Sequence, residues 1–315
     1  MLNWLLAGIG DISTRRVIPA LRNEPRSRLY GVVTRTPAKG AGVAEHVWNN
    51  FDAALADPAI DAVYIATPVA LHAPQTIAAL RAGKHVLCEK PIAMNYEQAS
   101  KMLATARDAG KVFGGAYYRR TYPKVQRARE LIQEGAIGQP VLAEANHHSQ
   151  LPAQGDFRGW LIDPKLAGGG PLYDVASHRI DLFNYLFGKP VRATGLLSNA
   201  VLKMPVEDNA TVLIEYESGV RGIVDVRWHS HVVRDQFRIV GTEGEINLDP
   251  LSGPELMSPR GAEHLPTHEN IHYPMIHNFV DAVLDGAPLI ASGESSIWTD
   301  WITERVIIES SLFPA

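Results

Sequence analysis

The sequence predicts an α/β fold in which a domain with a parallel sheet precedes a domain with a large, open, mainly antiparallel sheet. In the first 120 residues, short uninterrupted apolar runs alternate with longer helical patterns, which is typical of parallel strands covered by helices on both faces. Later strands alternate apolar and polar residues and are joined by tight turns, which is typical of antiparallel hairpins. We therefore expect two domains, residues 1–120 and residues 121–315.

The elements expected in the first domain are short strands separated by helices. Apolar runs predict strands at 4–7, 29–33, 62–66, 85–88 and 112–116. Residues 12–22 place Val17, Ile18 and Leu21 on one side of a helix. Glycines end two further helical patterns, at 74–82 and 99–109.

The second domain is expected to combine a few helices with hairpins. Helices are predicted at 125–133, 172–186 and 298–312, and hairpins at 211–228 and 236–248. Residues 250–270 are rich in Pro, Gly and polar residues and are interpreted as a long surface loop. A sheet with helices on one face leaves the other face free, so we expect a homodimer or homotetramer formed through this sheet.

Composition excludes several kinds of partner. The chain has 315 residues, is 46% hydrophobic and 20% charged, and carries a formal net charge of −4. This charge gives no electrostatic reason to expect nucleic acid or an anionic membrane as a partner. No apolar run is long enough to cross a bilayer, and the N-terminus lacks the basic segment of a signal peptide. The single cysteine, Cys88, cannot form an internal disulfide, so we expect a cytoplasmic location.

A glycine motif follows the first strand and opens the first helix: Gly8-Ile9-Gly10-Asp11-Ile12-Ser13. Gly8 and Gly10 occupy the first two of the three glycine positions of the motif. Glycines there allow a tight turn and let the backbone approach a pyrophosphate closely. Serine replaces the third glycine, and we expect this change only to loosen the packing of helix on strand. The alternative is a simple strand–helix turn, but the position between strand and helix favours a Rossmann dinucleotide site.

The end of the second strand bears on the choice of coenzyme. An acid at this position binds the ribose hydroxyl of NAD, but the sequence reads Val33-Thr34-Arg35-Thr36. A hydroxyl followed by a guanidinium suits the 2′-phosphate of NADP(H), since Arg binds phosphate through charge-assisted hydrogen bonds. We therefore favour NADP(H), with NAD(H) as the alternative if Arg35 only stacks on the adenine.

Polar residues follow two further strands of the parallel sheet. Thr67-Pro68 and His72 come after one strand, and Glu89-Lys90-Pro91 after the next. Ligands of open α/β sheets bind at the carboxyl ends of the strands. We therefore expect both segments at the cofactor site.

An acid and a histidine follow a triple glycine in the second domain. Asp174 and His178 are four residues apart and share a face of the expected helix, which Asp181 continues. A carboxylate beside an imidazole orients it and raises its basicity, which suits proton transfer. The alternatives are a structural helix histidine and a metal site, but no matching third ligand lies nearby in the sequence, so we expect no metal.

These segments together resemble the glucose–fructose oxidoreductase/inositol dehydrogenase family, in register from the first strand through Asp181. The resemblance rests on Gly8-x-Gly10, Ala66-Thr67-Pro68 with His72, Gly83-Lys84-His85-Val86 leading into Glu89-Lys90-Pro91, and Gly168-Gly169-Gly170 before Asp174 and His178. It implies a Rossmann domain followed by a domain with an open sheet. It also implies hydride transfer between a nicotinamide cofactor and a hydroxyl or carbonyl carbon, often of a sugar or cyclitol.

Residue roles follow from the resemblance by position. Lys90 corresponds to the family's active-site lysine, and Asp174 and His178 to its acid/base pair. Leu161 follows Trp160 where relatives commonly have an arginine, which puts a pyrophosphate contact there in doubt. The expected cofactor contacts are Gly8, Ile9, Gly10, Asp11, Ile12, Thr34, Arg35, Thr67, Pro68, His72, Glu89, Lys90, Arg119 and Trp160.

We expect His178, oriented by Asp174, to accept the hydroxyl proton in oxidation and to return it in reduction. We expect Lys90 to donate a hydrogen bond to the substrate oxygen. Which of Lys90 and His178 formally carries the proton stays open. Two other functions are compatible with the fold: an NAD-dependent glycoside hydrolase and a non-catalytic NAD(P)-binding regulatory protein. Arg35 argues against the first, and the presence of Lys90, Asp174 and His178 against the second.

Overall fold

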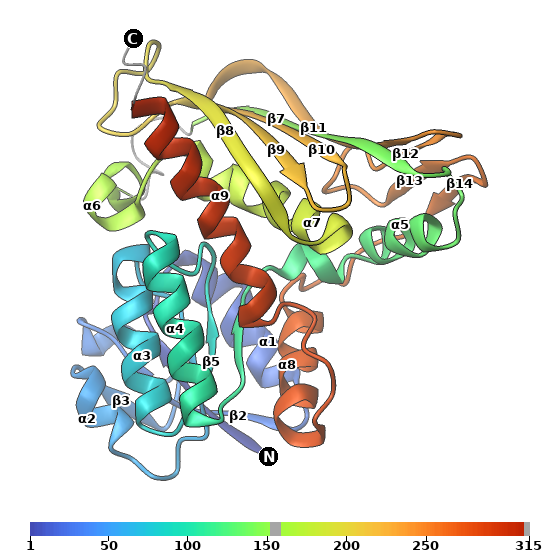
Figure 1. Ribbon diagram of the computed structural model, residues 1–315. Coiled ribbons are helices and arrows are strands. Elements are labelled where there is room, and N and C mark those ends of the chain that lie inside the picture. Colours follow the sequence, from blue (N-terminus) through green and yellow to red (C-terminus); the bar gives the residue numbers. More distant parts are fainter. Residues whose placement is uncertain (152–158, 312–315) are drawn as a thin grey trace. The chain divides into compact units, whose positions relative to one another are not determined.

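A six-stranded parallel sheet forms the centre of the first unit in the computed structural model, which describes residues 1–151 and 159–311 (Figure 1). The strand order is β3-β2-β1-β4-β5-β6. The strands are β1 Leu2–Ala7, β2 Ser27–Val33, β3 His46–Trp48, β4 Ala62–Ile65, β5 His85–Cys88 and β6 Phe113–Gly115. This sheet confirms the predicted Rossmann domain. Strand β3 was not expected, because His46 and Val47 are exposed and form no buried apolar run.

Helices separate these strands along the chain. They are the π-helical turn η1 Ser13–Val17, α1 Ile18–Asn23, α2 Phe51–Leu55, α3 His72–Arg81 and α4 Tyr96–Ala109, with 3-10 turns η2 Pro37–Lys39 and η3 Val69–Leu71. Helix α4 begins where the Asn95 side chain accepts the N–H of Gln98, and it ends at Gly110 in the left-handed conformation. The helix expected at 12–22 is also present. Its part Ser13–Val17 is a π-helical turn, and α1 follows directly.

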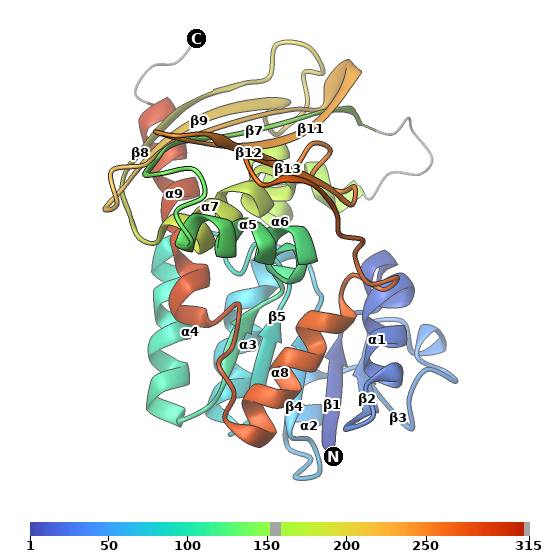
Figure 2. The same cartoon turned by 90° about the vertical axis from the view of Figure 1, so that its right-hand side faces the viewer.

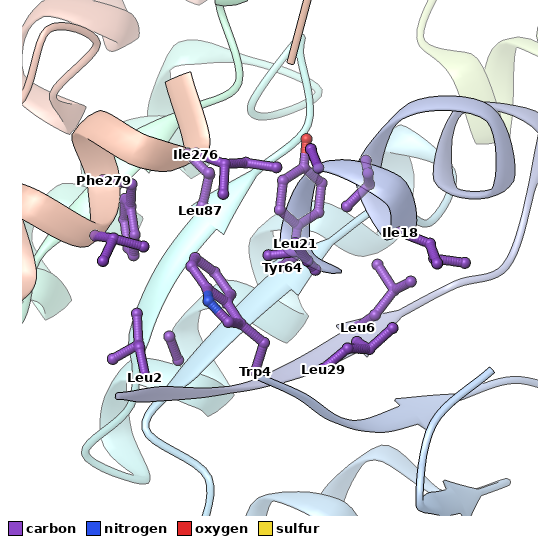
Figure 3. Packing of buried hydrophobic residues seen from close by; sticks show 14 of the residues in the cluster. Leu2, Trp4, Leu6, Ile18, Leu21, Leu29, Tyr64, Leu87, Ile276 and Phe279 are labelled. Atoms are coloured by element: carbon purple, nitrogen blue, oxygen red, sulfur yellow. The ribbon is translucent and has the colours of Figure 1, made fainter. Parts of the chain in front are cut away.

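Helix α8 (Tyr273–Asp285) returns to the first unit from late in the sequence. The two units are Met1–Tyr118 with His268–Ile297, and Arg119–Thr267 with the segment from Trp298 onward. Phe279 of α8 packs on Trp4 of β1, with ring centroids 5.2 Å apart (Figure 3). The expected boundary at residue 120 does not include this return, because local patterns do not reveal where a distant helix packs.

The second unit contains an eight-stranded sheet with the order β14-β13-β12-β11-β7-β10-β9-β8. Its strands are β7 Pro140–Gln150, β8 Pro190–Ser198, β9 Asn209–Tyr216, β10 Arg221–Arg227, β11 His229–Gly241, β12 Glu245–Asn247, β13 Glu255–Ser258 and β14 Gly261–His264. Its neighbouring strands are antiparallel apart from β7 and β10, which run parallel. The mainly antiparallel sheet is therefore confirmed.

The expected surface loop at 250–270 is wrong in part, since it contains β13 and β14. These strands pair with each other as a short hairpin, and β13 joins β12 through Asn247 and Met257. Most of their residues are not buried. The sequence therefore lacks the alternation of apolar and polar residues that marks a half-buried strand.

Helices cover one face of this second sheet. The helical elements are η4 Tyr118–Thr121, α5 Pro123–Gln133, η5 Gly159–Ile162, α6 Pro164–Ala167, η6 Leu172–Ala176, α7 Ser177–Phe187 and α9 Gly293–Ser311. Figure 2 shows α5, α6 and α7 on the same side of the sheet. Phe183 of α7 packs on Phe237 of β11, with ring centroids 5.2 Å apart. Among the described residues, no helix combines the length and apolar character needed to cross a membrane.

Replacing Phe279 by Ala should lower the free energy of unfolding by about 3–5 kcal/mol, because a fully buried ring is removed and a cavity remains. The Phe279 side chain has 0% exposure, whereas Leu284 on the same helix is 41% exposed. The measurement is urea unfolding followed by fluorescence and far-UV circular dichroism. The control, Leu284→Ala, should cost less than about 0.5 kcal/mol. Equal, small losses for both variants would show that α8 is not part of this core.

Candidate active site

The glycine turn after β1 has a geometry that only small residues permit. Gly8 has a φ of +96°, and a Cβ at this position would lie 2.7 Å from the carbonyl oxygen of Ala66. A Cβ on Gly10 would meet no protein atom within 4 Å, so the backbone there is open. The Ser13 hydroxyl is buried and donates to the Gly8 carbonyl over 2.9 Å. The serine therefore ties the first helical turn to the glycine turn, which goes beyond the expected slight loosening.

The end of β2 presents a basic side chain next to a buried hydroxyl. Thr34 is buried, and its hydroxyl oxygen accepts the N–H of Thr36 over 3.2 Å. Arg35 is exposed between them. The end of β2 therefore carries a positive charge that is open to solvent.

His72 begins α3 and joins the two loops that follow β4 and β5. Its ring is 1% exposed, with Nδ1 2.8 Å from the Pro91 carbonyl oxygen and Nε2 2.8 Å from the Thr67 carbonyl oxygen. Burial lowers the pKa of His72, although both carbonyls and Glu89 oppose this shift. The ring of this expected cofactor residue therefore contacts backbone carbonyls. Thr67 itself is half-buried and donates its hydroxyl to Gln75 over 2.8 Å.

Glu89 is a buried carboxylate directly before Lys90. Its Oε1 accepts the Tyr64 hydroxyl over 2.8 Å and lies 3.4 Å from His272 Nε2. Its Oε2 accepts the backbone N–H of Lys90 over 3.2 Å. Burial alone would raise the pKa of Glu89, but His272, Tyr64 and Lys90 together hold it below the ordinary value. The half-buried Lys90 therefore follows a fixed negative charge at the carboxyl end of β5.

Two members of this cluster were not found from the sequence. Tyr64 lies inside a buried apolar run and carries no polar pattern. His272 is far away in the sequence and comes close only because the segment before α8 returns to the first unit. The Tyr118 ring packs on His272, with centroids 4.4 Å apart. Sequence reasoning had no signal for His272 other than its being a histidine.

The triple glycine of the second unit allows a close approach to Glu207. A Cβ on Gly170 would lie 2.1 Å from the Glu207 carbonyl oxygen. The Glu207 carboxylate accepts the N–H of Gly170 over 2.8 Å and that of Leu172 over 3.0 Å. This carboxylate satisfies N–H groups that a helix start leaves without partners. Glu207, another residue that the sequence did not single out, therefore anchors the segment that carries Asp174 and His178.

Asp174 and His178 lie on a helix that begins with a π turn. The Ser177 N–H bonds the Leu172 carbonyl, five residues back, before α7 begins. The helix expected at 172–186 is therefore present, and its first turn, Leu172–Ala176, is π-helical. Such π turns occur often at functional sites. Asp174 is half-buried and His178 is buried.

Asp181, Arg119 and Trp160 lie in different surroundings within the second unit. Asp181 and Arg120 form a buried bidentate pair, with bonds of 2.9 and 2.6 Å. Arg119 donates to the Ser252 hydroxyl over 3.2 Å. Trp160 packs at the edge of an apolar cluster that contains Leu161, Val206 and Trp228. Asp181 is therefore committed to an ion pair, and Trp160 has mainly apolar neighbours.

The comparisons with known proteins agree with these features. Residues 2–117 match the oxidoreductase family with an NAD-binding Rossmann fold, and residues 125–247 match the GFO/IDH/MocA C-terminal domain. The chain belongs to this oxidoreductase family. The family expected from the sequence motifs, and with it the class of NAD(P)-dependent oxidoreductase, is confirmed.

Relatives cover nearly the whole chain. A 1,5-anhydro-D-fructose reductase of Ensifer adhaerens is 31% identical over 314 residues, with 95% of this chain and 93% of the relative covered. A D-xylose 1-dehydrogenase (NADP(+)) 2 of Haloferax volcanii is 29% identical, with 80% of this chain and 78% of the relative covered. The aldose-aldose oxidoreductase from Caulobacter crescentus, solved with glycerol, has a TM-score of 0.88 at 26% identity and covers 99% of this chain and 98% of its own. Levoglucosan dehydrogenase, solved with NADH and levoglucosan, has a TM-score of 0.88 at 25% identity and covers 99% of this chain and 97% of its own.

Asp235 fixes the residue after His178 to the sheet. Its Oδ1 accepts Arg179 over 2.6 Å and lies 3.5 Å from His147 Nδ1, and its Oδ2 accepts the N–H of Ser252 over 2.8 Å. Burial would raise the pKa of Asp235, but His147, Arg179 and Ser252 hold it far below the ordinary value. The carboxylate is therefore ionised. It stabilises the fold at pH values above the pKa that this carboxyl group has in the unfolded chain.

Asp235→Asn should lower the free energy of unfolding at pH 7 by about 3–5 kcal/mol, because the buried Arg179 loses its charged partner. A depressed carboxyl pKa stabilises the fold above the unfolded value, and this contribution is lost as pH falls through the folded value. The difference between wild type and variant should therefore shrink below about pH 4. Urea unfolding across this pH range measures it, with the exposed Asp108→Asn as control. A difference that is constant with pH would contradict the assignment of the charge.

Proposed function

We propose that this oxidoreductase transfers a hydride between NADP(H) and a hydroxyl or carbonyl carbon of a sugar, cyclitol or related diol. The observation that carries the proposal is the position of Lys90, at the carboxyl end of β5 beside the buried, ionised Glu89. Further support comes from the relatives, which are named as a fructose-derivative reductase and a xylose dehydrogenase. The substrate class is taken from those names and from the chemistry of the residues.

The residues of this chain divide the work of proton transfer. The bound nicotinamide supplies or accepts the hydride. The Lys90 ammonium donates a hydrogen bond to the substrate oxygen and stabilises the alkoxide that develops there. His178 accepts the hydroxyl proton in oxidation and returns it in reduction, with Asp174 holding the imidazole.

The residues of the first unit fit a dinucleotide. The open backbone at Gly10 admits a pyrophosphate, and the tight turn at Gly8 positions it. The exposed Arg35 pairs with the 2′-phosphate of NADP(H). The further contacts that we assign are Ile9, Asp11, Ile12, Thr34, Thr67, Pro68, Glu89, Arg119 and Trp160.

The free face of the second sheet supports assembly into a homodimer or homotetramer. Leu196 is 70% exposed and Leu213 is 48% exposed. They share a face of the sheet, because Leu196 pairs with Thr211 and Leu213 pairs with Thr194. On the other face of β9, Val212 and Ile214 are buried. An apolar sheet face of this kind is usually covered. We assign the protein to the cytoplasm because its single cysteine, Cys88, cannot form an internal disulfide.

Oxidation and reduction assays with NADP⁺, NAD⁺, NADPH and NADH test the proposal directly. Sugars, cyclitols, diols and keto-sugars are offered, and coenzyme absorbance is followed. We expect net turnover with at least one substrate and a preference for NADP(H). Cleavage of a glycoside without net change in coenzyme absorbance would overturn the proposal in favour of a hydrolase. Binding of coenzyme without any turnover would favour a regulatory protein.

Lys90→Ala should lower kcat by about 10²–10⁴-fold, because the substrate oxygen loses its charged donor. The dissociation constant for NADPH, followed by fluorescence, should change by less than about 3-fold, since the backbone of the loop is kept. The control is Lys101→Ala, on the exposed surface of α4. Normal kcat in the Lys90 variant would remove this residue from the mechanism.

Arg35→Ala should weaken NADPH binding by about 10-fold or more, because a charge-assisted hydrogen bond to the 2′-phosphate is lost. NADH lacks this phosphate, so its binding should change by less than about 3-fold. Titration of both coenzymes by fluorescence measures the two effects, with Arg81→Ala on α3 as an exposed control. Equal losses for NADPH and NADH would contradict the preference.

A further inference from the structure

The imidazole of His72 lies between two backbone carbonyl groups. Its Nδ1 is 2.8 Å from the Pro91 oxygen, and its Nε2 is 2.8 Å from the Thr67 oxygen. The ring is 1% exposed. A carbonyl oxygen only accepts hydrogen bonds, and a neutral imidazole carries a hydrogen on one of its two nitrogens. The buried ring therefore donates to one of the two carbonyls and contacts the other.

These two loops follow neighbouring strands of the parallel sheet. Thr67 comes two residues after β4, and Pro91 comes three residues after β5. The strands pair in parallel, with Ile65 opposite Cys88. The ring therefore connects the two loops at the edge where ligands of such a sheet bind.

The carbonyl that His72 Nδ1 contacts belongs to the residue after Lys90. On the other side, the Lys90 N–H donates to Glu89 Oε2 over 3.2 Å. Glu89 is held in turn by Tyr64 at 2.8 Å, and it lies 3.4 Å from His272. The backbone around Lys90 is therefore fixed from both directions by buried polar groups, which are costly to leave unsatisfied.

We propose that His72 is a positioning residue for Lys90, acting through the Pro91 carbonyl; this inference rests on the proposed function of Lys90. In the tautomer with the hydrogen on Nδ1, the bond to Pro91 holds the loop so that the Lys90 ammonium meets the substrate oxygen in the reactive geometry. Nε2 then contacts the Thr67 carbonyl oxygen of the neighbouring loop. The ring is buried and contacts these two backbone carbonyls.

Two amide substitutions separate the two contacts. The side-chain nitrogen of Asn lies near the position of Nδ1, so His72→Asn keeps the donor toward Pro91. The side-chain nitrogen of Gln lies near the position of Nε2, so His72→Gln moves the donor toward Thr67 and loses the bond to Pro91. Each variant can donate one buried hydrogen bond, so similar effects on stability are expected.

His72→Gln should lower kcat by about 10–100-fold, because a small displacement of the reacting group has effects of this size. His72→Asn should recover kcat to within about 3-fold of wild type, and His72→Ala should resemble the Gln variant. The substrate KM, the NADPH dissociation constant and the melting temperature should be similar in the Asn and Gln variants. The control His268→Gln replaces an exposed histidine of the same unit. Equal kcat in the Asn and Gln variants, or a loss confined to NADPH binding, would overturn the proposal.

A second measurement needs no turnover. Acetylation of lysines by acetic anhydride is followed by mass spectrometry, and the rate at Lys90 is divided by that at the exposed Lys101. His72→Gln should change this ratio by about 3-fold or more, whereas His72→Asn should leave it near the wild-type value. Identical ratios in both variants would overturn the positioning role. If the wild-type enzyme turns over none of the substrates, the proposed function fails, while the acetylation ratio still decides the role of His72.

Discussion

The parallel pairing of β1, β4 and β5 is the constraint on which the first unit depends. Leu6 lies opposite Tyr64, and Tyr64 lies opposite Leu87. Because parallel strands end at the same edge, the turns after these three strands are neighbours although they are far apart in the sequence. An antiparallel strand would move its loop to the opposite edge. The glycine turn, the Thr67 loop and the Glu-Lys-Pro loop therefore lie at one edge of the sheet.

The buried charge at Glu89 adds a second constraint. An ionised carboxylate in the interior is stable only where hydrogen bonds and opposite charges replace water. The partners of Glu89 come from β4, from its own loop and from the segment before α8. The return of α8 to the first unit therefore completes the surroundings of the lysine loop as well as the core around Trp4.

In the second unit, steric fit at Gly170 constrains the segment that carries Asp174 and His178. Gly170 lies so close to Glu207 that any side chain would collide with its backbone. The Glu207 carboxylate then binds the first N–H groups of the segment, and the π turn follows before α7. Asp235 holds the next turn through Arg179. The carboxylates of Glu207 and Asp235 thus fix the segment that carries Asp174 and His178.

The sequence by itself determined the fold class, the family and the segments at the sheet edge, because glycine spacing, strand periodicity and the order of motifs are local properties. It singled out Lys90 and Arg35 as candidate site residues, because they follow β5 and β2. Only the tertiary structure decided that α8 belongs to the first unit, that β13 and β14 exist, and that helix 172–186 starts with a π turn. It also revealed Tyr64, His272 and Glu207, and the two carbonyl partners of His72. These depend on contacts between distant residues, which no local pattern encodes.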